Sequence, residues 1–284
     1  MVAHGKKGEI QMQKRLFKNL AIMSAVALVL TACGGNSNES DGVPKIDMMK
    51  SLGAGEGAVN VVAWAGYVEN GSTDPKVDWV TGFEKETGCK VNYKVGSTSD
   101  EMVSLMQSGE YDVVSASGDA SLRLIYGGDV APINTDLISN YSDVFDNLKL
   151  QPWNSINGVP YGVPHGRGAN LLAYRTDIVK PAPTSWGAVF DSNSPYKGKI
   201  TAYDSPIYIA DAALYLMKTQ PDLGITYPYA LDQKQFDASI ALLKAQKPLV
   251  GEYWGDYLKH VASLKSGATA LGTTWQVNIN LAQG

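Results

Sequence analysis

The sequence predicts an α/β protein built from two lobes. Segments with the two-residue periodicity of strands alternate with segments that have the periodicity of helices, which is typical of a parallel or mixed sheet with helices on its faces. Residues 151–170, rich in Asn, Gly and Pro, interrupt this alternation near the middle of the chain. No segment repeats at a fixed period, so the pattern favours two lobes over a solenoid. With 284 residues, 44% of them hydrophobic, the chain is long enough to build two cores.

Residues 1–32 have the features of a lipoprotein signal peptide. Basic residues precede an apolar run over residues 20–30, which is well short of the roughly 20 residues that a membrane-spanning helix needs. The letters "LTAC" followed by "GG" resemble the lipobox of bacterial lipoproteins, in which Cys33 becomes the lipidated first residue. The alternative is an ordinary secretory signal that contains a cysteine. The lipobox predicts an extracytoplasmic lipoprotein anchored to the cell membrane, in the periplasm or on the outer face of the cytoplasmic membrane.

The first lobe is predicted over residues 58–166, after a flexible tether at residues 33–57 that is rich in Gly and Ser. Its first strand is expected at 59–64. Its first helix is expected at 74–88, with a proline near the start and a glycine where the helix stops.

The remaining elements of the first lobe continue the alternation. Thr98 and Glu101 have the spacing of a capping box, which predicts the start of a helix. The expected elements are a strand at 90–95, a helix at 98–109, a strand at 111–117 and a helix at 121–128.

The second lobe is predicted over residues 167–275 and has the same style. Residues 276–284 are expected to begin a return crossing toward the first lobe. The expected elements are strands at 169–174 and 199–203, helices at 207–218, 233–246 and 256–267, and a last strand at 268–275.

Charge, cysteine content and motifs restrict the chemistry. Without the leader's five Lys/Arg and one Glu, 19 basic and 27 acidic residues remain, a net charge of −8 that makes nucleic acid an improbable partner. Cys89 is the only cysteine besides Cys33, so neither an intramolecular disulfide nor a thiolate metal cluster is expected in the mature chain. The three histidines form no H-E-x-x-H motif, and neither a phosphate loop nor a dinucleotide fingerprint is present. We expect no metal and no cofactor.

Aromatic and polar side chains fall where predicted strands meet loops, which is where ligands sit in α/β sheets. Aromatic faces with carboxylates suit a small organic cation. For each aromatic residue the alternative is ordinary packing, and Asp119 and Asp204 have the alternative of capping a helix. The candidate ligand-binding residues from this pattern are Trp64, Tyr67, Ser117, Asp119, Asp204, Tyr208, Trp254, Asp256 and Trp275.

Several motifs in one order carry a family resemblance over about residues 58–284. They are "VVAWAGYVENGSTD", "FEKETGCKVNY", "SGEYDVVSAS", "YGVPHGRGANLLAY", "SWGAVFDSNSPYKGKI" and "LGTTWQ". In this order they resemble the spermidine/putrescine group of extracytoplasmic solute-binding proteins of ABC importers.

The resemblance implies a fold and a function. The fold is that of type II periplasmic binding proteins, in which two α/β lobes joined by a hinge close over a ligand in the cleft between them. The function is capture of a polyamine, similar to putrescine or spermidine, by a monomer that delivers it to permease subunits in the membrane. Trp64 and Tyr67 match the family's W-x-x-Y after the first strand, Ser117 its serine after the Y-D-[LV]-V strand, and Trp275 its tryptophan after the last strand.

The sequence departs from this family at several points. Where polyamine binders have a carboxylate pair after the strand at 199–203, this sequence has Asp204 with Ser205 and Tyr208. Asp119 stands where the family has an aromatic residue. Arg167 stands where the family tends to have a bulky aromatic or neutral residue; its guanidinium would repel a polyamine unless Asp119 or Asp204 neutralises it, and would bind a ligand carboxylate. A zwitterionic amine such as 4-aminobutyrate is therefore an alternative ligand. The chain also stops nine residues after Trp275, where the family continues; a protein complete at Gly284 is expected to be poorly stable or to close weakly.

Two alternatives belong to other functional classes. One is an enzyme of the polyhydroxybutyrate-synthase type with Ser117 or another serine as nucleophile and His165 as base, although no G-x-S-x-G elbow is present. The other is a sensor or adhesion lipoprotein that reuses the binding fold. Genes for a permease and an ATPase beside this one would favour transport.

Overall fold

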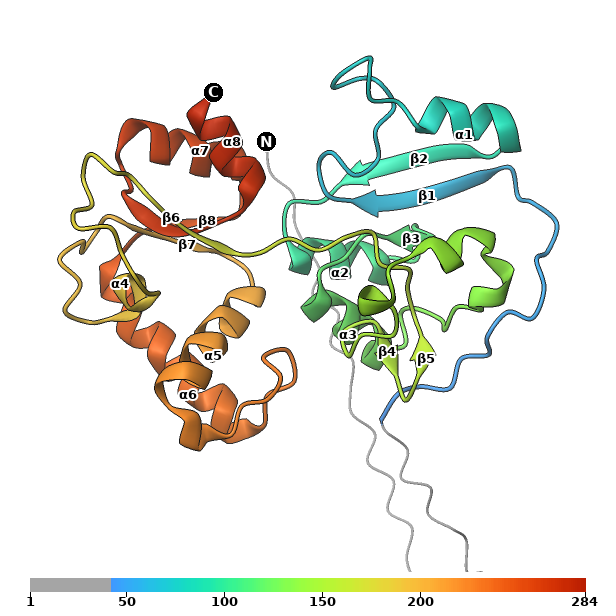
Figure 1. Cartoon of the computed structure of the whole chain (residues 1–284). Helices are drawn as coiled ribbons and strands as arrows, with labels where there is room; N and C mark the ends of the chain where they lie inside the picture. The colour runs from blue at the N-terminus through green and yellow to red at the C-terminus, as the bar shows by residue number, and fades with distance from the viewer. Residues whose placement is uncertain (1–41) are drawn as a thin grey trace, which may run out of the picture. The chain divides into compact units, whose positions relative to one another are not determined.

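The computed structural model describes residues 42–284 (Figure 1). The predicted leader, the predicted lipidation residue Cys33 and the first part of the tether lie outside the described residues. Residues 42–57 contain no helix or strand. Of the helices between residues 42 and 284, none is both long and apolar enough to span a bilayer.

The first sheet has three parallel strands in the order β2-β1-β3. Val61 of β1 lies opposite Tyr93 of β2 and Val113 of β3. The helices supply buried residues such as Met102 and Leu124. The strands are β1 (Ala58–Ala63), β2 (Lys90–Val95) and β3 (Val113–Val114), and the helices are α1 (Val80–Thr87), α2 (Ser99–Gln107) and α3 (Gly118–Gly127).

The first two helices refine the sequence predictions. The helix expected from residue 74 begins only at Val80, because Asp78 forms an isolated bridge with Asn70 and its Oδ1 accepts a hydrogen bond from the Thr81 backbone N–H at 2.9 Å. In α2 the Thr98 side chain accepts from Glu101 N as predicted. The carboxylate of Glu101, however, accepts from Ser97 N rather than from Thr98 N, so the reciprocal half of the capping box is displaced by one residue.

Short elements connect the two sheets. The strand expected at 111–117 is reduced to the two residues of β3. After α3 come three 3-10 turns and a hairpin, and residues 161–170 then run without helix or strand to the second sheet (Figure 1). The turns are η1 (Thr135–Leu137), η2 (Ser139–Asp143) and η3 (Asp146–Leu148), and the hairpin strands are β4 (Ser155–Ile156) and β5 (Val159–Pro160).

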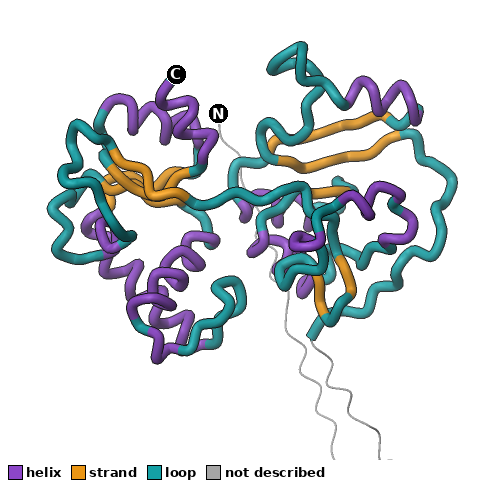
Figure 2. Tube along the Cα trace, viewed as in Figure 1, coloured by secondary structure: helices purple, strands orange, loops and turns teal. Residues whose placement is uncertain are grey.

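The second sheet has the order β6-β9-β7-β8, with β9, β7 and β8 parallel and β6 antiparallel to β9. Helices α4, α5 and α6 lie on one face of this sheet and α7 and α8 on the other (Figures 1 and 2). The strands are β6 (Leu171–Tyr174), β7 (Ile200–Tyr203), β8 (Val250–Trp254) and β9 (Leu271–Thr274). The helices are α4 (Gly187–Phe190), α5 (Ile207–Thr219), α6 (Gln233–Gln246), α7 (Tyr257–Ser266) and α8 (Gln276–Gln283), with 3-10 turns η4 (Pro221–Leu223) and η5 (Lys247–Leu249).

Strand β8 is absent from the sequence prediction. Its letters, "VGEYW", include a glycine and a charged residue, which are depleted in strands. The glycine is required by close packing, because a Cβ at Gly251 would overlap the carbonyl oxygen of Gly198. Local propensity therefore opposes this strand, and tertiary packing imposes it.

Candidate ligand site

Four aromatic rings meet at the carboxyl ends of the parallel strands. Trp64 follows β1, Tyr203 ends β7, Trp254 ends β8 and Trp275 follows β9. The ring of Trp275 is the common neighbour: its centroid lies 4.9 Å from that of Tyr203, 5.0 Å from that of Trp254 and 6.0 Å from that of Trp64, all three edge-to-face. We call these four residues the aromatic cluster. It joins the first sheet to the second.

The depth of the rings differs within the aromatic cluster. Trp64 and Trp275 are half-buried, whereas Trp254 is 2% exposed. Trp254 stacks on His260 of α7 with centroids 4.4 Å apart, and His260 Nε2 lies 2.8 Å from Thr274 Oγ1. Burial lowers the pKa of His260 to about 4, so its ring is neutral at pH 7. This neutral ring packs against Trp254. Trp254 is therefore a packing residue beneath Trp275 more than an open face for a ligand.

A group of polar side chains lies at the start of α3. Ser117 Oγ donates to Asp119 Oδ1 at 2.6 Å and lies 2.7 Å from Ser99 Oγ. Burial is the main cause that raises the pKa of Asp119 above its ordinary value, and the hydrogen bond from Ser117 acts against it. The second carboxylate oxygen, Oδ2, is buried and has no hydrogen-bond partner among the described residues. Asp119 thus offers a free acceptor in a partly desolvated place.

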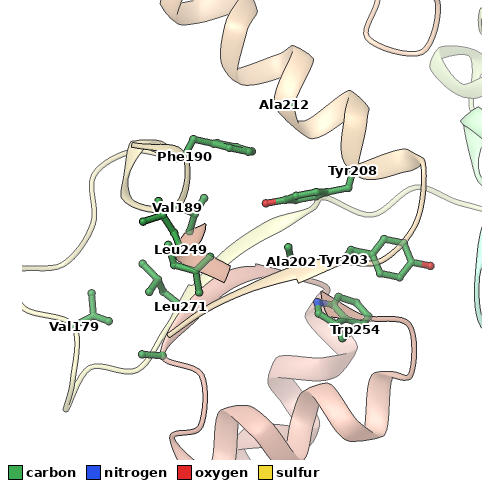
Figure 3. Packing of buried hydrophobic residues seen from close by; sticks show 12 residues of the cluster. Val179, Val189, Phe190, Ala202, Tyr203, Tyr208, Ala212, Leu249, Trp254 and Leu271 are labelled. Atoms are coloured by element: carbon green, nitrogen blue, oxygen red, sulfur yellow. The ribbon is translucent and has the colours of Figure 1, made fainter. Parts of the chain in front are cut away.

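Two predicted site residues, Tyr208 and Asp256, have other surroundings. Tyr208 is 3% exposed and lies in the second core, where its hydroxyl accepts a hydrogen bond from Gln246 Nε2 at 2.8 Å. Figure 3 shows Tyr208 and Trp254 on opposite faces of the sheet. Asp256 is exposed and caps α7, since its Oδ1 accepts from Leu258 N at 2.9 Å. Packing accounts for the position of Tyr208 and helix capping for that of Asp256, and a role of either residue in ligand binding stays a prediction.

Asp204 is an exposed residue directly after β7. It does not cap α5, whose N-cap is Pro206. Its backbone N–H donates to Trp254 O at 2.8 Å, which fixes its place at the sheet edge. Burial is the main cause that raises the pKa of the Tyr203 hydroxyl. The negative charges of Asp119, Asp100 and Asp204 raise it further. Asp204, directly after β7, and Asp119, in the first turn of α3, therefore act on the same ring.

The glycine-rich segment at 161–170 places its basic residues on the surface. The His165 ring stacks on Tyr67 with centroids 4.6 Å apart. Arg167 is exposed and lines an open hollow of about 430 Å³ together with His165. Ser117 and His165 thus have different neighbours, which does not favour the enzyme alternative. The other residues lining the hollow are Asp143, Val144, Phe145, Asn147, Leu148, Pro164 and Gly166.

Sequence patterns did not single out Asn170, Asp211 and Tyr229, of which Asn170 is hydrogen-bonded to Trp275 of the aromatic cluster. Trp275 Nε1 donates to Asn170 Oδ1 at 3.1 Å, and Asn170 Nδ2 donates to Asp211 Oδ1 at 2.7 Å. Burial raises the pKa of Asp211 to about 6. Burial also raises the pKa of Tyr229 to about 12, and the charges of Asp119 and Asp211 add to this rise. Asp211 had a signal in the sequence, because it is a lone acidic residue in the otherwise apolar run of α5 before Lys218.

This combination of groups can bind but shows no device for covalent chemistry. Aromatic faces attract organic cations, and carboxylates with free oxygens accept the hydrogen bonds of ammonium groups. The arrangement is suited to holding a small cation against the rings.

A family model described as "Bacterial extracellular solute-binding protein" matches residues 78–284. The putrescine-binding periplasmic protein SpuD of Pseudomonas aeruginosa (strain UCBPP-PA14) is 25% identical over 220 residues, which are 74% of this chain and 56% of SpuD.

Two solved structures show the same fold. The TpPotD lipoprotein of Treponema pallidum superposes with a TM-score of 0.61 at 16% identity, over 79% of this chain and 66% of that chain. The Atu4243-GABA receptor gives a TM-score of 0.54 at 20% identity, over 80% of this chain and 65% of that chain. The chain therefore spans between 56% and 66% of the length of these three relatives. The likeness confirms the two-lobe fold of type II periplasmic binding proteins, and the match over residues 78–284 shows that the chain belongs to the family of bacterial extracellular solute-binding proteins.

Proposed function

We propose that this protein is the solute-binding component of an ABC importer and captures a polyamine such as putrescine. The observation that carries the proposal is the aromatic cluster together with the free carboxylate oxygen of Asp119. The rings supply faces for the aliphatic and ammonium parts of the ligand, and the carboxylate supplies a charge-assisted hydrogen bond. The relative SpuD, a putrescine-binding protein by name, supports this choice of ligand.

The proposed arrangement has two lobes with the boundaries predicted from sequence, residues 58–166 and 167–275. Ligand would be held between the ends of the two sheets, and residues 161–170 would act as the hinge. Trp64 and Ser117 belong to the first lobe, whereas Tyr203 and Trp275 belong to the second. A ligand that touches both groups favours closure, because it adds contacts that only the closed state makes.

We also propose an extracytoplasmic location with a lipid on Cys33. The family is extracellular by description, and the lipobox supports the anchor. Changing Cys33 to Ser should release the protein from the membrane fraction and abolish labelling by radioactive palmitate. Membrane association that survives this change would contradict the anchor.

A second ligand class is favoured by Arg167. Its exposed guanidinium beside His165 can receive a carboxylate, and a GABA receptor is among the proteins of similar fold. An ω-amino acid such as 4-aminobutyrate is the corresponding ligand. Changing Arg167 to Ala should abolish binding of such a zwitterion, or strengthen binding of a diamine, and an unchanged profile would place Arg167 outside the site.

Thermal unfolding with candidate ligands tests the proposal. A ligand that binds only the folded state at 100 times its Kd stabilises it by about 2.7 kcal/mol, so putrescine or spermidine should raise the melting temperature more than 4-aminobutyrate or neutral amino acids. Changing Trp275 to Ala should reduce the rise strongly. The matched control is Trp79→Ala, since Trp79 is 50% exposed before α1. No rise with any amine would refute the polyamine proposal.

A further inference from the structure

Asp211 has an unused acceptor in a buried position. It lies on α5 and is 8% exposed, and its Oδ1 accepts a hydrogen bond from Asn170. Its other oxygen, Oδ2, is buried and has no hydrogen-bond partner among residues 42–284. Buried carboxylate oxygens are normally hydrogen-bonded, because leaving one unpaired forfeits its hydration. The Oδ2 of Asp211 is therefore available to accept a hydrogen bond from a bound donor.

Asn170 ties this carboxylate to the aromatic cluster. The amide uses its nitrogen for Asp211 and its oxygen for Trp275 Nε1. Both partners therefore fix the orientation of the Asn170 amide. Asp211 is connected to Trp275, the central ring of the aromatic cluster, by two successive hydrogen bonds. Asp211 is thus connected to the aromatic cluster through a single intervening side chain.

Asp119 repeats the same arrangement in the first lobe. Ser117 occupies its Oδ1, while its Oδ2 is buried and unpartnered among the described residues. The charges of Asp119 and Asp211 both act on Tyr229, whose ring lies against α3, where a Cβ at Gly118 would come 3.1 Å from Tyr229 Cε2. The two carboxylates that each keep an oxygen without a partner, on α3 and on α5, are thus both close enough to one tyrosine to act on its pKa.

We propose that Asp211 is a specificity-determining residue whose Oδ2 accepts one ammonium group of the ligand while Asp119 accepts the other. This inference rests on the proposed function, because it assumes a cation at the aromatic cluster. It adds that the site selects ligands with two ammonium groups, joined by a short aliphatic chain, over ligands with one. Each free oxygen then has a charged donor, and each ammonium has a carboxylate.

The competing explanation is structural, since Asp211 also holds Asn170 and through it Trp275. The substitution Asp211→Asn separates the two roles. The new amide has nearly the same size and keeps an oxygen that accepts from Asn170 Nδ2, but it removes the negative charge. A purely structural Asp211 predicts unchanged ligand selectivity in this variant.

Calorimetric titration with putrescine and with 1-aminobutane tests the inference, because the two amines share a four-carbon chain and differ in the second ammonium. In Asp211→Asn the affinity for putrescine should fall by about 10- to 100-fold, the worth of a charged hydrogen bond. The affinity for 1-aminobutane should fall by less than about threefold, since its single ammonium can bind at Asp119. The matched control is Asp222→Asn, which removes the same charge from an exposed residue after α5 and should change neither affinity.

The outcomes separate this inference from the proposed function. If the unaltered protein binds neither amine, the polyamine proposal fails and this inference fails with it. If it binds putrescine and Asp211→Asn binds putrescine equally well, or loses both amines equally, only the role of Asp211 is refuted. Should Asp211→Asn not fold, Asp211→Ser, which also removes the carboxylate, is to be titrated in the same way with the same expectations.

Discussion

At the scale of single residues, burial separates ligand-facing groups from packing groups of the same type. Trp275 and Trp254 both end strands of one sheet, but Trp254 is enclosed between Trp275 and His260, whereas Trp275 is half-buried beside Trp64. Tyr203 and Tyr208 lie five residues apart, yet the first joins the aromatic cluster and the second bonds Gln246 in the core. Residue type alone does not distinguish them.

Asp211→Asn is expected to stabilise the ligand-free protein at pH 7. The folded-state pKa of Asp211, about 6, lies above its ordinary value of 3.8, so the folded protein binds this proton more tightly than the unfolded chain does. Ionisation of Asp211 therefore lowers stability as the pH rises from about 4 to about 6. Removing the charge should raise the free energy of unfolding at pH 7 by about 1–3 kcal/mol.

Urea unfolding at pH 7 and at pH 4 measures this effect. The gain should be largest at pH 7 and nearly vanish at pH 4, where the native carboxyl is already protonated. Asp222→Asn, at an exposed site, should be close to neutral at both pH values. A variant that is less stable than the parent at pH 7 would show that the carboxylate itself contributes to the fold.

At the scale of elements, two glycines show how packing differs between a strand of the second sheet and the exposed helix α1. Gly272 of β9 pairs with Thr201 of β7, and a Cβ at Gly272 would overlap the Thr201 carbonyl oxygen and press on its side chain. Gly82, in the middle of α1, has no atom within 4 Å of an added Cβ. The two positions therefore respond oppositely to the same substitution.

Gly272→Ala is expected to destabilise the protein by about 2–3 kcal/mol or more, because β7 and β9 would have to move apart. Gly82→Ala should instead stabilise it by about 0.5–1 kcal/mol, since alanine is the better helix former. Denaturant unfolding of both variants makes the comparison. Equal effects would contradict the close approach of the two strands.

The buried His260 of α7, which contacts Thr274 of β9, should make stability depend on pH. His260 has a folded-state pKa of about 4, below its ordinary 6.5, because burial penalises the charged ring. The unfolded chain then binds this proton more readily, so stability should fall as the pH drops from 6.5 toward 4. Replacing His260 with Gln should flatten this part of the stability profile, as followed by thermal unfolding between pH 7 and pH 4; a profile that keeps its slope would assign the loss to other groups.

At the scale of the whole molecule, the proposed ligand touches residues from both sheets. Hydrogen exchange followed by mass spectrometry should therefore slow in β1 and α3 as well as in β7 and β9 when putrescine is added, because binding opposes opening of every segment that contributes contacts. Trp275→Ala with the same amount of putrescine is the control and should show little protection. Protection confined to one sheet would contradict a ligand held between two lobes.

Much of the secondary structure was predictable because it rests on local patterns. The α6 helix was predicted at its observed bounds, and its capping residue Asp232 bonds Gln235 in a full capping box. Strand β8 and helix α8 were not predicted, because β8 contains Gly251 and Glu252 and α8 has a mixed sequence of modest apolar content. Their formation depends on the neighbours that cover them.

Most of the strands and helices, the aromatic residues directly after strands, and the resemblance to solute-binding proteins could all be inferred from the sequence. All three follow from residues close together in the chain. Three further features became visible only in the folded chain: Trp64 meets Trp275, Asn170 bridges Trp275 and Asp211, and Tyr208 is a core residue. These pairings depend on the strand order β6-β9-β7-β8 and on the contact between the two sheets. Residues 41 to 211 positions apart meet there, and no local pattern records which of them will face one another.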